Sequence, residues 1–149
     1  MIRHILAAAL IAIPAAVSAS PDRFSVTIGS HHTDRSYDWS EVNPGVFLTW
    51  ENVGPVDLSG GAFLNSFGGP SVAAVAALPL VEWISGEIAV FGGLAWYPGY
   101  GDEFLVHAGD IVPMGGLQIR QGIAFVQIAP GKIEPLEGIF AFGLTFPLN

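Results

Sequence analysis

The chain has 149 residues and a formal net charge of −8, and only 12% of its residues are charged while 51% are hydrophobic. This length allows one domain, the apolar content excludes a disordered chain, and the acidic balance without a Lys/Arg cluster argues against nucleic-acid binding. The chain has no cysteine, which excludes thiol catalysis and thiolate zinc sites. We expect neither a cofactor nor a bound metal.

Residues 1–19 have the pattern of a Sec-type signal peptide. Arg3 and His4 precede an apolar run over residues 5–16, and the small-residue sequence VSA follows at 17–19. This pattern predicts export, with cleavage after residue 19 and a mature domain over residues 20–149. The apolar run is too short for a membrane-spanning helix, which needs about 20 residues. A buried core helix is the alternative interpretation of this segment.

Apolar and polar residues alternate with a period of two through most of the remaining chain, which predicts β-strands. Eight segments carry the pattern: 24–29, 46–51, 56–65, 71–80, 84–96, 111–119, 123–129 and 140–148. Most are near the 9–11 residues that a tilted membrane strand requires.

The connections between these segments alternate between short and longer ones, as in outer-membrane barrels. The last segment also has one face made of Phe and Leu, which lipid accepts more readily than water. We therefore expect an all-β fold, an eight-stranded antiparallel up-and-down transmembrane β-barrel in the outer membrane. A soluble barrel is the alternative, but segments 71–80 and 84–96 lack the polar face that it needs.

If the first strand runs from the periplasm to the cell surface, strand parity divides the lumen into two halves. Polar side chains would form a floor at the periplasmic end, with Arg120 as the only obvious cation, shared by several carboxylates: Glu51, Asp57, Glu87, Gln118 and Arg120. Apolar side chains would line the outer half: Phe47, Phe63, Phe91, Val112 and Met114. An eight-stranded barrel can be filled by side chains or can hold one small ligand. Both a hydrocarbon site and plain packing remain open.

The same topology brings candidate catalytic residues to the outer rim. His31 and His32 lie at the start of the first long loop, and Asn65 and Ser66 lie at the end of the third strand. A serine within reach of a histidine base, with a third polar group as orienter, is the minimum for acyl transfer. Ordinary loop residues are the alternative reading. The two histidines would not share a metal, since neighbours on a strand point to opposite faces.

Three prolines, Pro44, Pro113 and Pro130, fall near the same rim. A proline cannot donate to a strand ladder, so each one weakens the pairing with a neighbouring strand. Pro113 and Pro130 lie on adjacent strands, where they would open a lateral gate toward lipid. Alternatively, Pro44 and Pro130 simply end strands at loops.

Three stretches of the sequence resemble the lipid A palmitoyltransferases of the Gram-negative outer membrane. The stretch HHTDRSYDWSEVNPGVFL resembles the first loop of that family, AFLNSFG its catalytic segment, and IVPMGGLQIRQGIAFVQIAPG its sixth and seventh strands. That family is an eight-stranded barrel whose interior holds one palmitoyl chain taken from a phospholipid. Prolines flank the lateral openings through which lipids reach its lumen.

The resemblance implies a role for each matching residue. His31 or His32 would match the catalytic histidine, Ser66 the catalytic serine and Asn65 the catalytic aspartate. Asparagine in place of the acid removes the carboxylate that orients the histidine, unless Asp34 or Asp38 supplies one. The three prolines would match gate residues.

The implied function is transfer of an acyl chain from a phospholipid to lipid A or another lipid. The expected partners are therefore phospholipid and lipopolysaccharide, and the barrel is expected to be a monomer. The alternative is a small non-catalytic outer-membrane barrel with a structural or surface-interaction role.

Overall fold

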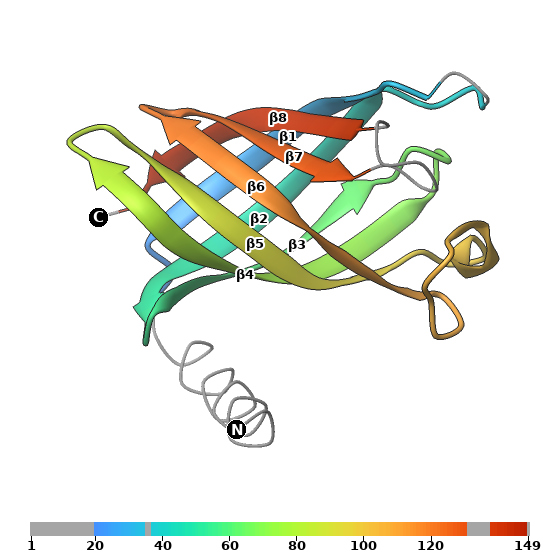
Figure 1. Ribbon diagram of the computed structural model, residues 1–149, viewed down its shortest axis with the longest axis horizontal. Helices are drawn as coiled ribbons and strands as arrows, with labels where there is room; N and C mark the ends of the chain where they lie inside the picture. The colour runs from blue at the N-terminus through green and yellow to red at the C-terminus, as the bar shows by residue number, and fades with distance from the viewer. Residues whose placement is uncertain (1–19, 35–36, 131–137, 149) are drawn as a thin grey trace.

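The structure, a computed structural model, describes residues 20–34, 37–130 and 138–148. It contains eight strands and one short helix: β1 Arg23–His32, β2 Val42–Val53, β3 Val56–Leu64, β4 Pro70–Trp83, β5 Gly86–Trp96, η1 Gly101–Glu103, β6 Ile111–Gln121, β7 Ala124–Pro130 and β8 Gly138–Pro147. Each strand pairs antiparallel with the next, and β8 pairs with β1 to close a barrel (Figure 1). The predicted eight-stranded antiparallel barrel is confirmed. The predicted signal peptide lies outside the described residues.

The two ends of the barrel differ in their connections. Short turns join β2 to β3, β4 to β5 and β6 to β7 at one end, which we call the floor. The opposite end, which we call the rim, carries the longer connections 33–41, 65–69 and 97–110, and Figure 1 shows the two sets on opposite sides of the barrel. The candidate residues His31 and His32, which end β1, and Asn65 and Ser66, in the connection 65–69, therefore lie at the same end of the barrel.

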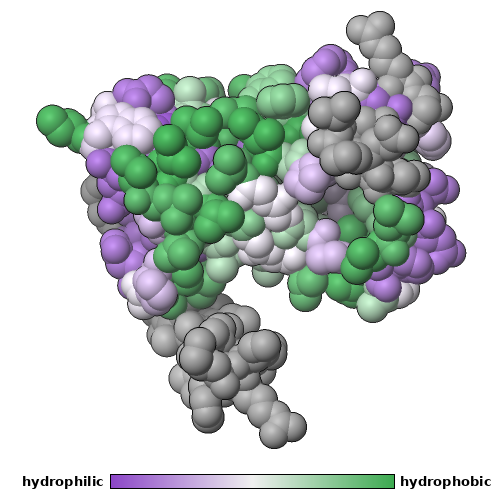
Figure 2. All heavy atoms as spheres, in the orientation of Figure 1, coloured by the Kyte–Doolittle hydropathy of each residue, from purple (hydrophilic) through white to green (hydrophobic). Residues whose placement is uncertain are grey.

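The outer surface of the barrel is more apolar than its interior. Small side chains face inward on β4 and β5, where Ala73, Ala77, Ala89 and Ala95 are buried. Large side chains on the same strands face outward and are exposed: Val72, Leu78, Val90, Leu94 and Trp96. Figure 2 shows such residues gathered over the strands, with hydrophilic residues toward both ends. No helix among the described residues is long and apolar enough to cross a membrane.

A β-bulge in β1 changes which residues face the lumen. The register of β1 with both neighbours shifts between Thr27 and Gly29. Ser25 and Thr27 face inward before the bulge, whereas Ser30 and His32 line the interior after it. Because a bulge adds one residue to one strand, it inverts the alternation beyond it. Simple parity from Ser25 would instead have turned His31 inward.

The pairing between β6 and β7 stops well before the rim. β5 and β6 pair along their whole length, up to Trp96 and Ile111. β6 and β7 pair only between the floor and the pair Leu117–Ile128. Among the described residues, therefore, none on β7 pairs with residues 111–116 in the rim half of β6. Pro113 lies on this half of β6 and Pro130 ends β7, so the two prolines flank the unpaired part of this seam.

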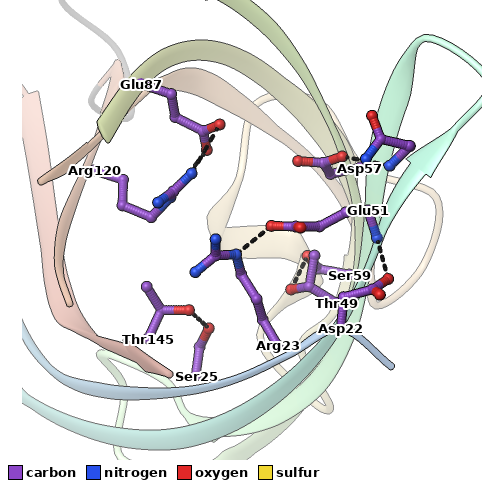
Figure 3. A network of polar contacts seen from close by, with 11 residues as sticks. Asp22, Arg23, Ser25, Thr49, Glu51, Asp57, Ser59, Glu87, Arg120 and Thr145 are labelled. Atoms are coloured by element: carbon purple, nitrogen blue, oxygen red, sulfur yellow. Dashed lines mark hydrogen bonds and ion pairs between the residues drawn. The ribbon is translucent and has the colours of Figure 1, made fainter. Parts of the chain in front are cut away.

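A polar network fills the floor half of the lumen (Figure 3). Arg23 forms an ion pair with Glu51, and Arg120 forms one with Glu87, whose Oε2 lies 3.2 Å from Nη2. The expectation that Arg120 would be the obvious cation shared by several carboxylates was wrong. Arg23 is a second inward cation, because it shares the parity of Ser25 at the start of β1.

Candidate functional site

Above the polar floor, the barrel contains a partly open cavity of about 440 Å³. The apolar side chains expected in the outer half of the lumen are among its lining residues: Phe47, Phe63, Phe91, Val112 and Met114. Phe47 and Phe63 stack on one side, with ring centroids 6.1 Å apart. These side chains line the lumen without filling it, so the rim half of the barrel has room for a ligand.

The two adjacent histidines have different surroundings. His32 lines the cavity and is 8% exposed. Its ring stacks on that of Trp39, with centroids 4.6 Å apart and planes 9° apart, and its Nδ1 has no hydrogen-bond partner among the described residues. His31 is exposed, and its Nδ1 lies 2.8 Å from Oε1 of Glu41. Of the pair, His32 is thus the one that can meet a ligand in the cavity.

Asn65 is almost completely buried, at 1% exposure, and holds the 65–69 turn together. Its side-chain oxygen accepts backbone N–H bonds from Phe67 and Gly69 at 2.9 and 3.0 Å. Its side-chain nitrogen donates to Oγ of Ser71 at 2.9 Å. These three hydrogen bonds of the Asn65 side chain fix the shape of the turn that carries Ser66.

Ser66 lies in this turn, next to the cavity. Its backbone carbonyl oxygen accepts the backbone N–H of Ser40 at 2.9 Å, which ties the first long loop to the β3–β4 turn. The elements that carry His32 and Ser66 are therefore joined directly at the rim.

Sequence reasoning missed a buried asparagine beneath this rim. Asn43 of β2 accepts a hydrogen bond from Oγ of Ser30 at 2.6 Å and donates its side-chain N–H to the carbonyl oxygen of Leu64 at 3.1 Å. It thereby links β1, β2 and β3 next to Pro44, which has no N–H to donate. Its place immediately before a proline and a glycine was the signal available in the sequence.

Aromatic side chains from three connections pack together over the rim end of the cavity. This aromatic cluster consists of Tyr37, Trp39, Phe67, Tyr97, Tyr100 and Phe104. Phe67 is at its centre: it stacks on Tyr100 at 4.7 Å and meets Trp39 edge-on at 5.4 Å. Burial raises the pKa of Tyr97 to about 12. Sequence reasoning did not anticipate this cluster, although each of the three connections carries an aromatic residue.

Among the described residues, the other titratable side chains at the rim form no second cluster of catalytic or metal-binding type. His107 approaches Asp102, with Nδ1 3.7 Å from Oδ1, and its Nδ1 also lies 3.0 Å from the carbonyl oxygen of Gly109. No group of three or more His, Asp or Glu side chains in the described part of the chain is placed to hold a metal ion.

Comparison with protein-family models gives no match for this chain, and comparison with curated proteins gives none either.

Proposed function

We propose that the chain is an outer-membrane acyltransferase, similar to the lipid A palmitoyltransferases, that moves an acyl chain from a phospholipid to lipid A or another lipid. The apolar outer surface of the strands supports a membrane location, since it would be costly in water. Within the described strands the charged residues all lie in the floor half: Arg23, Glu51, Asp57, Glu82, Glu87 and Arg120. A charge-free apolar band on the outer face is what a membrane barrel requires.

The observation that carries this proposal is the 440 Å³ apolar cavity with His32 and Ser66 in its wall. Ligand pockets usually measure about 300–1,000 Å³, so the cavity has the size of a binding site. A hydrocarbon chain inserted toward the floor would leave its ester group near the rim. The polar network of Arg23, Glu51, Glu87 and Arg120 ends the apolar region and would set the depth of insertion.

In the proposed reaction, His32 takes the proton of the Ser66 hydroxyl as Oγ attacks the ester carbonyl of the donor lipid. The ester C–O bond then breaks, and the lysophospholipid alcohol leaves with the proton from His32. A hydroxyl of the acceptor lipid attacks the acyl-serine in the same way, again with His32 as base, which transfers the chain and restores Ser66.

We further propose that lipids reach the cavity sideways, through the seam between β6 and β7. Pro113, Gly115 and Pro130 line the cavity at the place where this pairing has stopped. The aromatic cluster crowds the rim end, where Trp39, Phe67 and Tyr97 line the cavity, so the seam is the more direct route for a membrane lipid. Pro44 has no pair in the registers of β2 with β1 and β3, and marks a second weakened position.

Lipid binding without turnover, in a non-catalytic barrel, is the alternative. Asn65 stands where the resembled family has an acid, and Nδ1 of His32 has no hydrogen-bond partner among the described residues. A histidine without an orienting carboxylate is a weaker base than one in a complete triad.

The test is mass spectrometry of lipid A and phospholipids from a palmitoyltransferase-null Gram-negative host that expresses the chain. We expect a new acylated lipid that disappears with Ser66→Ala and with His32→Ala. His31→Ala is the matched control and should leave the product in place, because His31 points outward. An unchanged lipid profile, from protein folded in the outer membrane, would favour the non-catalytic barrel.

A further inference from the structure

We infer that Trp39 is a positioning residue for His32, and that its indole does the orienting work that a carboxylate usually does for a catalytic histidine. This inference rests on the proposed acyl transfer, because it concerns the same histidine. It assigns a role to a side chain in a loop that neither the strand pattern nor the family resemblance singled out.

The ring of Trp39 contacts His32 where a hydrogen bond to Nδ1 would otherwise hold the imidazole. In a Ser-His-Asp triad the acid holds the imidazole through Nδ1, but Nδ1 of His32 has no hydrogen-bond partner in the described part of the chain. The imidazole instead lies parallel to the indole, at 4.6 Å and 9°. The plane of a histidine ring is set by χ1 and χ2, so a parallel neighbour on one face restricts both angles. Aromatic pairs of this kind contribute about 0.5–1.5 kcal/mol beyond area burial.

Trp39 can orient another ring because it is itself held from several sides. Its Nε1 donates to the backbone carbonyl oxygen of Asp34 at 3.1 Å. Its ring meets Phe67 edge-on at 65° and Tyr37 at a tilt of 42°. These contacts come from both the first long loop and the β3–β4 turn.

The residue after Trp39 connects the same segment to the proposed nucleophile. Ser40 donates its backbone N–H to the carbonyl oxygen of Ser66 at 2.9 Å. Two consecutive residues therefore contact the two sides of the proposed site, Trp39 through the ring of His32 and Ser40 through the backbone of Ser66. A displacement of about 1 Å between catalytic groups can cost about 10²-fold in rate. This link would therefore hold the base and the nucleophile at a fixed distance from each other.

The experiment compares Trp39→Leu, which removes the ring, with Trp39→Phe, which keeps a flat ring in its place. Trp96→Leu is the matched control, since Trp96 is an exposed tryptophan that lines neither the cavity nor the polar floor. The full-length barrel is purified in detergent with isotope-labelled histidine, and the ring signals of His32 are assigned by their loss in His32→Gln. The initial rate of acyl transfer is measured on the same samples, with kcat and KM determined separately.

We expect the ring protons of His32 to be shifted upfield by the indole in the wild type. Trp39→Leu should abolish this shift and lower kcat by about tenfold or more with little change in KM. Trp39→Phe should retain part of the shift and most of the rate, and Trp96→Leu should change neither.

An unshifted His32 signal in the wild type, or one indifferent to Trp39→Leu, would overturn the inference. A shift lost without any loss of kcat would overturn the positioning role as well. If the folded wild type transfers no acyl chain at all, the proposed function fails and the positioning role for catalysis fails with it. The NMR comparison then still shows whether the ring stack exists, which separates the two failures.

Discussion

Arg120 on β6 lies directly opposite Glu87 on β5 in the strand register, and its guanidinium contacts both carboxylate oxygens of Glu87, at 3.4 Å from Nε and 3.2 Å from Nη2. The Glu87 side chain is 6% exposed and that of Arg120 is 16% exposed. Burying two charges is costly unless each is matched by the other. Removing either residue alone would therefore leave a buried charge without its partner and destabilise the barrel.

Removing the cation alone should destabilise the barrel strongly. We expect Arg120→Met to lower the free energy of unfolding by about 3–5 kcal/mol, because it leaves Glu87 buried without its partner. The double variant Arg120→Met with Glu87→Met should recover most of that loss. Urea unfolding in detergent micelles, followed by tryptophan fluorescence, measures all three proteins. Equal destabilisation of the single and double variants would contradict the pairing.

Asn65 should matter first for the stability of the turn that carries Ser66. Asn65→Ala removes the acceptor of two backbone N–H groups and the donor to Ser71, in a position that is almost completely buried. Each buried polar group left without a partner costs about 1–3 kcal/mol. We expect hydrogen exchange at the amides of Phe67 and Gly69 to accelerate in this variant.

Asn65→Asp is the informative counterpart. A carboxylate can accept the same two backbone N–H bonds and can also accept from the hydroxyl of Ser71. We therefore expect slow exchange at the Phe67 amide to be retained, unlike in Asn65→Ala. Rapid exchange in both variants would mean that the amide nitrogen, and not the oxygen, holds the turn.

Filling the cavity should shorten or exclude the bound hydrocarbon chain. Met114 lines the apolar cavity and also borders the small space among the polar side chains of the floor, so Met114→Trp would place a larger side chain at the bottom of the apolar region. Leu117→Trp is the control, since Leu117 lies on the same strand but is exposed on the outside. Mass spectrometry of co-purified lipids and of the transferred acyl chain should show a shorter or absent chain for Met114→Trp alone. An identical chain in both variants would place the hydrocarbon elsewhere.

The alternation of residues was enough to predict the eight strands, because outward apolar side chains alternate with inward ones that are small, polar or, toward the rim, aromatic. It was also enough to predict the polar floor, apart from Arg23, which lies one residue before the first segment counted as a strand. Strand parity could not choose between His31 and His32. The choice depends on the bulge between Thr27 and Gly29. Gly29 was the one sequence sign of that bulge, since an isolated glycine inside a strand pattern often marks one.

The rim was harder to predict because loop side chains are placed by contacts between distant segments. The stack joins His32, the last residue of β1, to Trp39 in the loop that follows, and that loop is itself held by Ser66 and Phe67 of another connection. Such contacts leave no periodic signal. Asn65 illustrates the same difficulty: its chemistry suggested an orienter for histidine, whereas its hydrogen bonds go to its own turn.

The unpaired half of the β6–β7 seam can be closed with an introduced disulfide. Because the chain has no cysteine of its own, two introduced cysteines can pair only with each other. Extending the register from Leu117–Ile128 would place Gly115 opposite Pro130. Gly115→Cys with Pro130→Cys should therefore form a disulfide when the seam closes, and oxidation should then block lipid entry while reduction restores it. The control is Ala62→Cys with Val72→Cys, which pair across the closed β3–β4 seam.

Lipid exchange is measured with a fluorescent phospholipid before and after reduction, in both double-cysteine proteins. We expect the oxidised Gly115/Pro130 variant to exchange lipid at least about tenfold more slowly than its reduced form, whereas the control pair should exchange at one rate in both states. This follows because a continuous ladder of hydrogen bonds leaves no lateral opening between strands. Unchanged exchange in the cross-linked protein would mean that lipid enters past the aromatic cluster at the rim, and Phe67→Ala would then accelerate it.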